Sequence, residues 1–368
     1  MAERTGDYEW LIEGEEAGIV FYAPDESALD YPRLRSGLDA ATRLPGIVDP
    51  VYAAASPHGS GWVTSSSSHV APGLVSAPRV GLLLAADTPM DRLGVPPEEL
   101  PRLLARSLSE VAMPRLSESE LVSACESGVK WAAGEGLIEE EDLAVFGGAG
   151  ASGDGDPDAL GRRALAAGAG EWDPRPGGGA RIFEAGEILD SRVAESLGIS
   201  GGSLLVVASA GAGELGRLAL EGHRQRMISR EVSDADRLVA APHVMEEAAD
   251  LLAADAAASC YAQARASLLI YALRRALGEV AGNLTLACVW NTGGFEERGG
   301  LTLHRRSLAR LAEDESLVCG DALALGAGAM TGSAPAFGAE GGREWPWEEA
   351  GLLRRVALLR EPGERPDG

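Results

Sequence analysis

Short apolar runs and longer stretches of helical periodicity follow one another along the chain. Four runs are apolar and bounded by turn residues: residues 18–23, 80–84, 204–207 and 284–290. Four other stretches have apolar residues at helical spacing: residues 27–43, 98–112, 117–135 and 243–277. The runs predict buried strands and the periodic stretches predict helices, with a capping box at Ser117 and Glu120. Residues 243–277 predict one long helix or two helices separated by a bend.

Residues 177–216 place two Gly-rich turns beside predicted strands. A Gly-rich turn and a short strand lead to a helix built on Ile188, Val193 and Leu197, which ends at Gly198. A Gly-Gly turn, the strand 204–207 and a second Gly-rich turn follow. Glycines let backbone approach a ligand closely. The two turns lie at the same end only if the strands are parallel, which the sequence leaves open.

The second turn, Gly211–Gly216, matches G-x-G-x-x-G directly after an apolar strand. In a dinucleotide-binding unit this turn leads to an apolar second strand with an acidic residue about 20 residues further on. Here the following residues, 223–226 and 230–234, are polar and do not predict a strand. An unrelated nucleotide-binding enzyme that uses this turn is therefore one alternative.

Composition limits the class of protein. The 368 residues are 45% hydrophobic and include no run close to the ~18 apolar residues of a membrane span. The four cysteines lie far apart and the first residues lack the apolar core of a signal peptide. We expect a reduced, cytoplasmic protein. The net charge of −24 disfavours RNA binding but leaves room for a local basic cleft, and Lys130 is the only lysine.

Several segments, in collinear order, resemble motifs of the RtcB-type RNA ligases. Gly178–Glu184 resembles GSGNHFLE and Ser209–Arg217 resembles HSGSRGLGH, at a similar separation. Val70–Leu84 resembles VxPGGVGYDINCGVRLL, and Trp290–Glu297 resembles AHNxAxFEE. Weaker similarities occur in the following segments: 44–47 to ATLPGI, 129–143 to GxxWAxxxGxxxxxDL, 303–306 to VHRKGATR, 328–330 to PGSM, 337–343 to FGSxxHGAGR and 350–360 to AGLAxxVxRLRPLG.

The resemblance implies an α+β fold with packed central β-sheets and helices outside. We expect a single RtcB-like domain over residues 1–360, with a flexible loop at about 147–157 and a polar tail at 361–368. The strands at 203–208 and 284–290 should lie side by side or face one another. Arg181, Ser209 and Trp290 would then surround one cleft.

The family joins RNA ends that carry a 3′-phosphate and a 5′-hydroxyl, using GTP and manganese. Its metals are held by Asp, Cys and three His, and a further His becomes guanylylated. At the three alignable metal-ligand His positions this chain has Arg181, Ser209 and Trp290. Ser76–Gly81 lacks the Asp–Cys pair, and Ala339 stands at the position of the nucleophile. We therefore predict a catalytically degenerate protein with a binding or regulatory role linked to RNA repair and ligation. It would have no catalytic residues, no metal ligands and no cofactor. An active GTP- and manganese-dependent ligase with an unrecognised site is the alternative.

A residual nucleotide or phosphate site is predicted from four residues: Arg181, Glu184, Gly328 and Arg343. The alternatives are a solvated strand-end carboxylate for Glu184 and a surface arginine for Arg343. Arg181 either holds an anion together with Arg343 or closes the pocket by pairing with an acid such as Glu184 or Glu214. The expected partners are RNA or an active RNA ligase homologue, with no membrane.

The histidines are weaker candidates. His58 and His69 are metal or phosphate ligands or, as we expect, polar turn residues. His304 with Arg305 and Arg306 would contact phosphate or, as we expect, form an exposed basic cluster after a strand.

Overall fold

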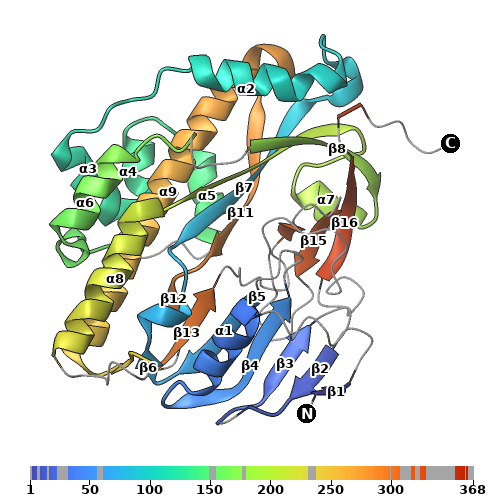
Figure 1. The fold of residues 1–368 in the computed structure, drawn as a ribbon. Helices are drawn as coiled ribbons and strands as arrows, with labels where there is room; N and C mark the ends of the chain where they lie inside the picture. Colours follow the sequence, from blue (N-terminus) through green and yellow to red (C-terminus); the bar gives the residue numbers. More distant parts are fainter. Residues whose placement is uncertain are drawn as a thin grey trace.

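The structure is a computed structural model with side chains. It describes the following residues: 2–5, 9–14, 16–22, 32–55, 61–148, 155–175, 180–230, 238–298, 300–306, 316–319, 324–328, 353–360 and 362–363. Helices and strands are mixed, and they form two seven-stranded sheets with helices packed against them, which confirms the predicted α+β class (Figure 1). Among the helices of the described residues, none is long and apolar enough to cross a membrane.

The first seven-stranded sheet, here the central sheet, has the strand order β11-β7-β9-β8-β16-β15-β14. Its strands are β7 (Arg79–Pro89), β8 (Ala180–Ile188), β9 (Ser203–Gly211), β11 (Leu284–Thr292), β14 (Ser316–Cys319), β15 (Ala324–Gly328) and β16 (Leu353–Arg360). The described pairings between neighbouring strands are antiparallel.

Strand β7 lies between β9 and β11 in one sheet, so the prediction that residues 203–208 and 284–290 lie side by side or face one another is wrong. The physical reason is that β7 is apolar on both faces. Leu82 and Leu84 pack on one side of it, and Leu83 and Ala85 pack on the other. A strand that buries both faces is stabilised at the centre of a sheet.

Helix α9 (Glu246–Ala281) covers one face of the central sheet as one continuous helix. Its Ala-rich sequence allows close contact, and Tyr261, Leu268 and Leu269 join the same core cluster as Leu82 and Leu84. Figure 1 shows α9 beside β7 and β11, with α8 and α6 outside it. The surrounding helices are α2 (Leu100–Glu110), α3 (Glu118–Ser127), α4 (Val129–Gly134), α5 (Glu140–Gly148), α6 (Arg162–Gly170) and α8 (Gly213–Ser229).

Local sequence explains two helix boundaries. Ser117 caps α3 with the predicted box, since its side chain accepts from the Glu120 amide while the Glu120 carboxylate accepts from the Ser117 amide. The predicted helix 117–135 is divided at Gly128, whose φ of +54° favours glycine and whose Cβ would lie 3.0 Å from the Cα of Cys260. The chain turns there because α9 passes close by.

The N-terminal sheet has the order β1-β2-β3-β4-β5-β13-β12. Its strands are β1 (Ala2–Arg4), β2 (Glu9–Ile12), β3 (Ile19–Tyr22), β4 (Ile47–Ala55), β5 (Gly61–Ser67), β12 (Phe295–Arg298) and β13 (Leu301–Arg306). Helix α1 (Pro32–Thr42) connects the parallel pair β3–β4 and packs on the sheet through Leu38, Ala41 and the following Leu44. A two-stranded sheet, β6 (His69–Val70) with β10 (Ala241–Pro242), lies beside it.

The central stretch differs from its prediction in one element. Ile188 belongs to β8, and helix α7 contains only Ser191–Ser196. Asp190 starts this helix by accepting hydrogen bonds from the amides of Arg192 and Val193, each at 3.1 Å. Strands β8 and β9 are antiparallel, and Ala180 at the start of β8 lies opposite Ala208 near the end of β9. The start of β8 and the end of β9 therefore meet at the same edge of the sheet, so the expectation that this requires parallel strands is wrong.

Candidate functional site

The face of the central sheet opposite α9, which we call the distal face, carries the residues at the alignable ligand positions. Direct cross-strand neighbours project to the same face of a sheet. Leu83, Leu205 and Phe183 form a cluster separate from the α9 side, and residues two positions away in the same strands share their face. Arg181 of β8 and Ser209 of β9 therefore lie on the distal face.

Gly81 in β7 lies opposite both Ser209 in β9 and Trp290 in β11. The three residues thus form one line across three adjacent strands. With neighbouring strands about 4.8 Å apart, the Cα atoms of Ser209 and Trp290 are roughly 10 Å from one another. Arg181 lies opposite Val207, one same-face position along β9 from Ser209. The structure therefore brings Arg181, Ser209 and Trp290 together on one face.

The indole of Trp290 lies over Gly81. A Cβ atom built on Gly81 would be 2.0 Å from Cε2 and 2.3 Å from Nε1 of that indole. Real Cβ contacts are never this short, so the indole occupies the space that any other side chain at position 81 would need. The absence of a side chain at Gly81 is what admits Trp290 to this position.

Gly81 was missed as a site residue, although the sequence contains the signal. Counting VxPGGVGYDINCGVRLL without gaps from Val70 places the Asp of the motif at Pro78 and its Cys at Gly81. On this count, the line across β9, β7 and β11 falls at the positions where the resembling motifs have His, Cys and His. Here those positions carry Ser209, Gly81 and Trp290.

These residues do not fit a divalent metal ion. Glycine has no side-chain ligand atom, the indole nitrogen is a donor only, and a neutral serine hydroxyl is at best a weak ligand. The guanidinium of Arg181 is a permanent cation and repels a metal. Within the part of the chain that the structure describes, no three His, Cys, Asp or Glu side chains gather as a metal site requires.

Two guanidinium groups lie on the distal face. Nη1 of Arg79 donates to Oγ of Ser209 at 3.2 Å. Arg181 is exposed, and its guanidinium carbon lies 5.2 Å from the centre of the Phe183 ring, which is a cation–π contact. Arg79 was not predicted, because no family motif marks it. A positively charged, hydrogen-bonding face of this kind suits an anion.

The structure does not bring the other predicted site residues to this face. Glu184 lies opposite Leu204, which packs on the α9 side, so its side chain starts from the face opposite that of Arg181. Gly328 ends β15, which is separated from β8 by β16. Arg343, Ala339 and His58 lie outside the described residues.

Glu214, the other acid considered as a partner for Arg181, is engaged elsewhere. Its carboxylate accepts from Nε of Arg217 at 2.7 Å, one turn further along α8. That hydrogen bond from Arg217 holds the pKa of Glu214 below its ordinary value. Of the two acids considered as partners for Arg181, Glu184 therefore starts from the other face and Glu214 is engaged by Arg217.

The turn Gly211–Gly216 is not a dinucleotide-binding turn. Strand β9 has antiparallel neighbours on both sides, whereas the dinucleotide unit is built on parallel strands. At the N-terminus of α8, the amide of Glu214 donates to Oε2 of Glu171 at 2.8 Å. A carboxylate of the chain itself thus occupies the place where a phosphate would bind.

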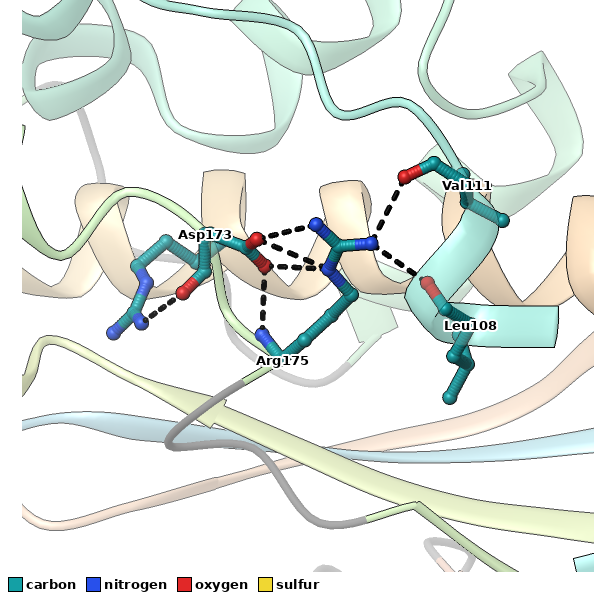
Figure 2. Close-up of polar contacts among 5 residues, drawn as sticks. Leu108, Val111, Asp173 and Arg175 are labelled. Carbon is teal, nitrogen blue, oxygen red and sulfur yellow. Dashed lines mark hydrogen bonds and ion pairs between the residues drawn. The ribbon is translucent and has the colours of Figure 1, made fainter. Parts of the chain in front are cut away.

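An arginine-centred cluster fixes the residues that precede β8 (Figure 2). Arg175 donates from Nε and Nη2 to both carboxylate oxygens of Asp173, at 2.6–3.0 Å. Its Nη1 donates to the carbonyls of Leu108 at 2.6 Å and Val111 at 2.9 Å. Arg265 of α9 donates to the Asp173 carbonyl at 3.2 Å. Partial burial raises the pKa of Asp173, but the hydrogen bonds and charge of Arg175 hold it below its ordinary value.

His304 is a structural residue, so both predictions for it are wrong. It lies fully buried in β13, where Nε2 accepts from the amide of Ala71 at 3.0 Å and Nδ1 lies 3.3 Å from the carbonyl of Ser65. Burial lowers the pKa of His304 to about 4. Its neighbour Arg305 pairs with Glu296 at 3.6 Å. The ring is neutral with its proton on Nδ1, and neither nitrogen is available to a ligand.

The remaining described histidines also have partners. His69 lies in β6, with Nδ1 3.2 Å from the hydroxyl of Ser68, so it is in a short strand and not in a turn. Nε2 of His223 lies 2.9 Å from the carbonyl of Ala159, and His243 pairs with Glu297 at 2.6 Å. None of these rings lies on the line of Ser209, Gly81 and Trp290.

Comparison with known proteins gives one family. The family model described as tRNA-splicing ligase RtcB matches residues 43–311, which is more than half of the chain. The match spans β7, β8, β9, β11 and α9. No curated protein matches the sequence.

Proposed function

The chain belongs to the RtcB family of RNA ligases, and from this premise we propose that it is a member without ligase activity that keeps a binding role in RNA repair and ligation. The observation that carries the proposal is the line of Ser209, Gly81 and Trp290 across the distal face. At these positions the family motifs have His, Cys and His. The metal ligands of the motifs are thus replaced at three positions, on three separate strands.

The loss of these donors removes the chemistry. In this family the metals polarise phosphate groups and support the attack on GTP, and a histidine forms the covalent link to GMP. One altered ligand is compatible with a variant mechanism. Replacement of every alignable ligand, together with Ala339 at the position of the nucleophile, leaves no group to activate GTP or to accept GMP.

The same face supports binding of an anion. Arg79 and Arg181 supply permanent positive charge without a metal, and Ser209 adds a hydroxyl that already accepts from Arg79. A guanidinium presents two parallel N–H groups that match phosphate oxygens. The ligand class is therefore a phosphate-bearing molecule, either a nucleotide or an RNA end. RNA or an active ligase homologue remains the proposed partner, and the cytoplasm remains the proposed location.

Transfer of GMP tests the catalytic part of the proposal. The purified protein is incubated with GTP labelled on its α-phosphate and with manganese, and protein-bound label is measured after denaturation. We expect no label. Label that is stable to denaturation and disappears in a His58→Ala variant would contradict the proposal and would favour the active ligase.

A calorimetric titration tests the binding part. GMP and inorganic phosphate are titrated into the wild type, into Arg181→Ala and into Arg102→Ala, which removes an exposed arginine on α2 as a matched control. We expect binding to the wild type and to Arg102→Ala that is lost in Arg181→Ala. Equal binding by all three proteins, or none by any of them, would contradict a site at Arg181.

A further inference from the structure

Gly81 and Trp290 depend on one another across the β7–β11 ladder. Gly81 lies in paired strand backbone without a left-handed φ, so alanine or cysteine fits the backbone at this position. The obstacle to any side chain is the indole, which overlaps the ideal Cβ position at 2.0–2.3 Å. The two residues are therefore compatible only as a pair.

The indole also lies where a ligand from position 81 would be. A cysteine ligand in this strand would project from Gly81 onto the distal face between Ser209 and position 290. That volume holds the benzo ring and the pyrrole nitrogen of Trp290. A thiolate, or a metal ion bound to it, cannot share this space with the indole.

We propose that Trp290 and Gly81 form an interlocked plug that closes the distal face to divalent metals. The inference goes beyond loss of the ligands, because it states that restoring ligands is not sufficient while the indole remains. It also assigns Trp290 a role that a passive replacement of histidine would not have. Arg79 and Arg181 lie on the same face as the plug.

A double-mutant cycle tests the interlock. Gly81→Ala in the wild type should lower the midpoint of thermal unfolding by about 2–6 °C, the usual cost of overpacking. In a Trp290→Ala background the same change should leave the midpoint unchanged or raise it slightly, because the obstructing ring is gone. Equal effects of Gly81→Ala in both backgrounds would overturn the proposal.

Restored ligands test the plug directly, with cobalt(II) as the probe. The variant G81C/S209H/W290H should develop the visible absorption of a cobalt–thiolate site, whereas G81C/S209H, which keeps Trp290, should not. The control G81C/S209A/W290H lacks one ligand and should bind cobalt at least tenfold more weakly. Cobalt absorption of equal strength in G81C/S209H would overturn the plug, and no absorption in the triple variant would overturn the assignment of this line to the metal ligands.

The two proposals fail in different ways. The proposal that the chain lacks ligase activity fails if the wild type accepts GMP from GTP. The plug fails if Gly81→Ala is tolerated equally with and without the indole, whatever the activity. The wild type and Trp290→Ala both keep Gly81. Their circular dichroism spectra serve as the folding references for the corresponding Gly81→Ala proteins.

Discussion

The two faces of the central sheet differ in what they carry. On the α9 side, Leu82 and Leu84 of β7 are fully buried beside Val206 of β9, in one continuous core with α9. On the distal face the same strands place Gly81 and Ser209, with guanidinium groups nearby. The α9 side is a close-packed apolar interior, whereas the distal face combines a buried apolar cluster, which includes Leu83 and Leu205, with polar and charged groups.

The difference shows that fold and chemistry are separable across a single sheet. Successive residues of a strand point to opposite faces, so a change at one position leaves the packing of its neighbours intact. Position 81 carries no side chain on the distal face, while Leu82 and Leu84 fill the core against α9. The side chains on the distal face can therefore change while the α9 side stays packed.

The largest expected effect is the loss of unfolding free energy caused by a substitution on the α9 side, compared with one on the distal face. Leu84→Ala removes a fully buried side chain between the sheet and α9 and should lower the free energy of unfolding by about 2–5 kcal/mol. Ser209→Ala on the distal face should lower it by only about 0.5–1.5 kcal/mol, because it removes one hydrogen bond from Arg79. Urea denaturation followed by circular dichroism measures both, and similar losses in the two variants would break the comparison.

The buried histidine extends the comparison to the N-terminal sheet. The pKa of His304 is lowered from 6.5 to about 4 by burial, so between these pH values the unfolded chain binds a proton that the folded chain does not. Stability should therefore fall on acidification from pH 6.5 toward pH 4, by up to about 3 kcal/mol. Burial raises the pKa of Asp255 to about 6, which acts in the opposite direction over part of this range.

Comparison with His304→Gln isolates the histidine, because Asp255 is common to both proteins. The glutamine carbonyl can still accept from the amide of Ala71. On acidification from pH 6.5 to pH 4.5, the free energy of unfolding should decrease more for the wild type than for the variant. Parallel pH profiles would show that His304 is not the neutral, buried group described here.

A smaller effect is expected at the cluster in Figure 2. Arg175→Ala leaves the carbonyls of Leu108 and Val111 and the carboxylate of Asp173 without this donor, and it should cost about 1–3 kcal/mol. Arg106→Ala on α2, the helix that carries Leu108, removes only an exposed i,i+4 pair with Glu110. It is the matched control, with no measurable change expected. Chemical denaturation of both variants decides whether the cluster anchors the segment before β8.

The smallest effect on stability is expected for Arg181→Ala. The side chain is exposed and contacts the ring of Phe183, so the unfolding midpoint should stay within the error of the measurement. Any phosphate binding should nevertheless be lost, and binding by the wild type should be unaffected by EDTA, because the charge comes from guanidinium groups. Phosphate binding that EDTA abolishes would contradict a metal-independent site.

Much of the fold followed from local pattern, whereas the site depended on pairing. The strands and the long helix α9 were predictable because their apolar spacing is regular over many residues. The position of β7 between β9 and β11 was not predictable, because an apolar run does not show which strands will pair with it. Gly81 could be found by counting along the family motif, but its contact with Trp290 joins residues far apart in sequence. His304 was misjudged because its adjacent arginines suggested exposure, while its own position in β13 faces the interior.

The joining of RNA ends tests the central claim most directly. An RNA with a 3′-phosphate and a second RNA with a 5′-hydroxyl are incubated with the protein, GTP and manganese, and an active ligase of the family serves as the positive control. The account predicts no joined product from this chain under conditions in which the control joins the ends completely. Joined product that depends on both GTP and manganese would contradict it.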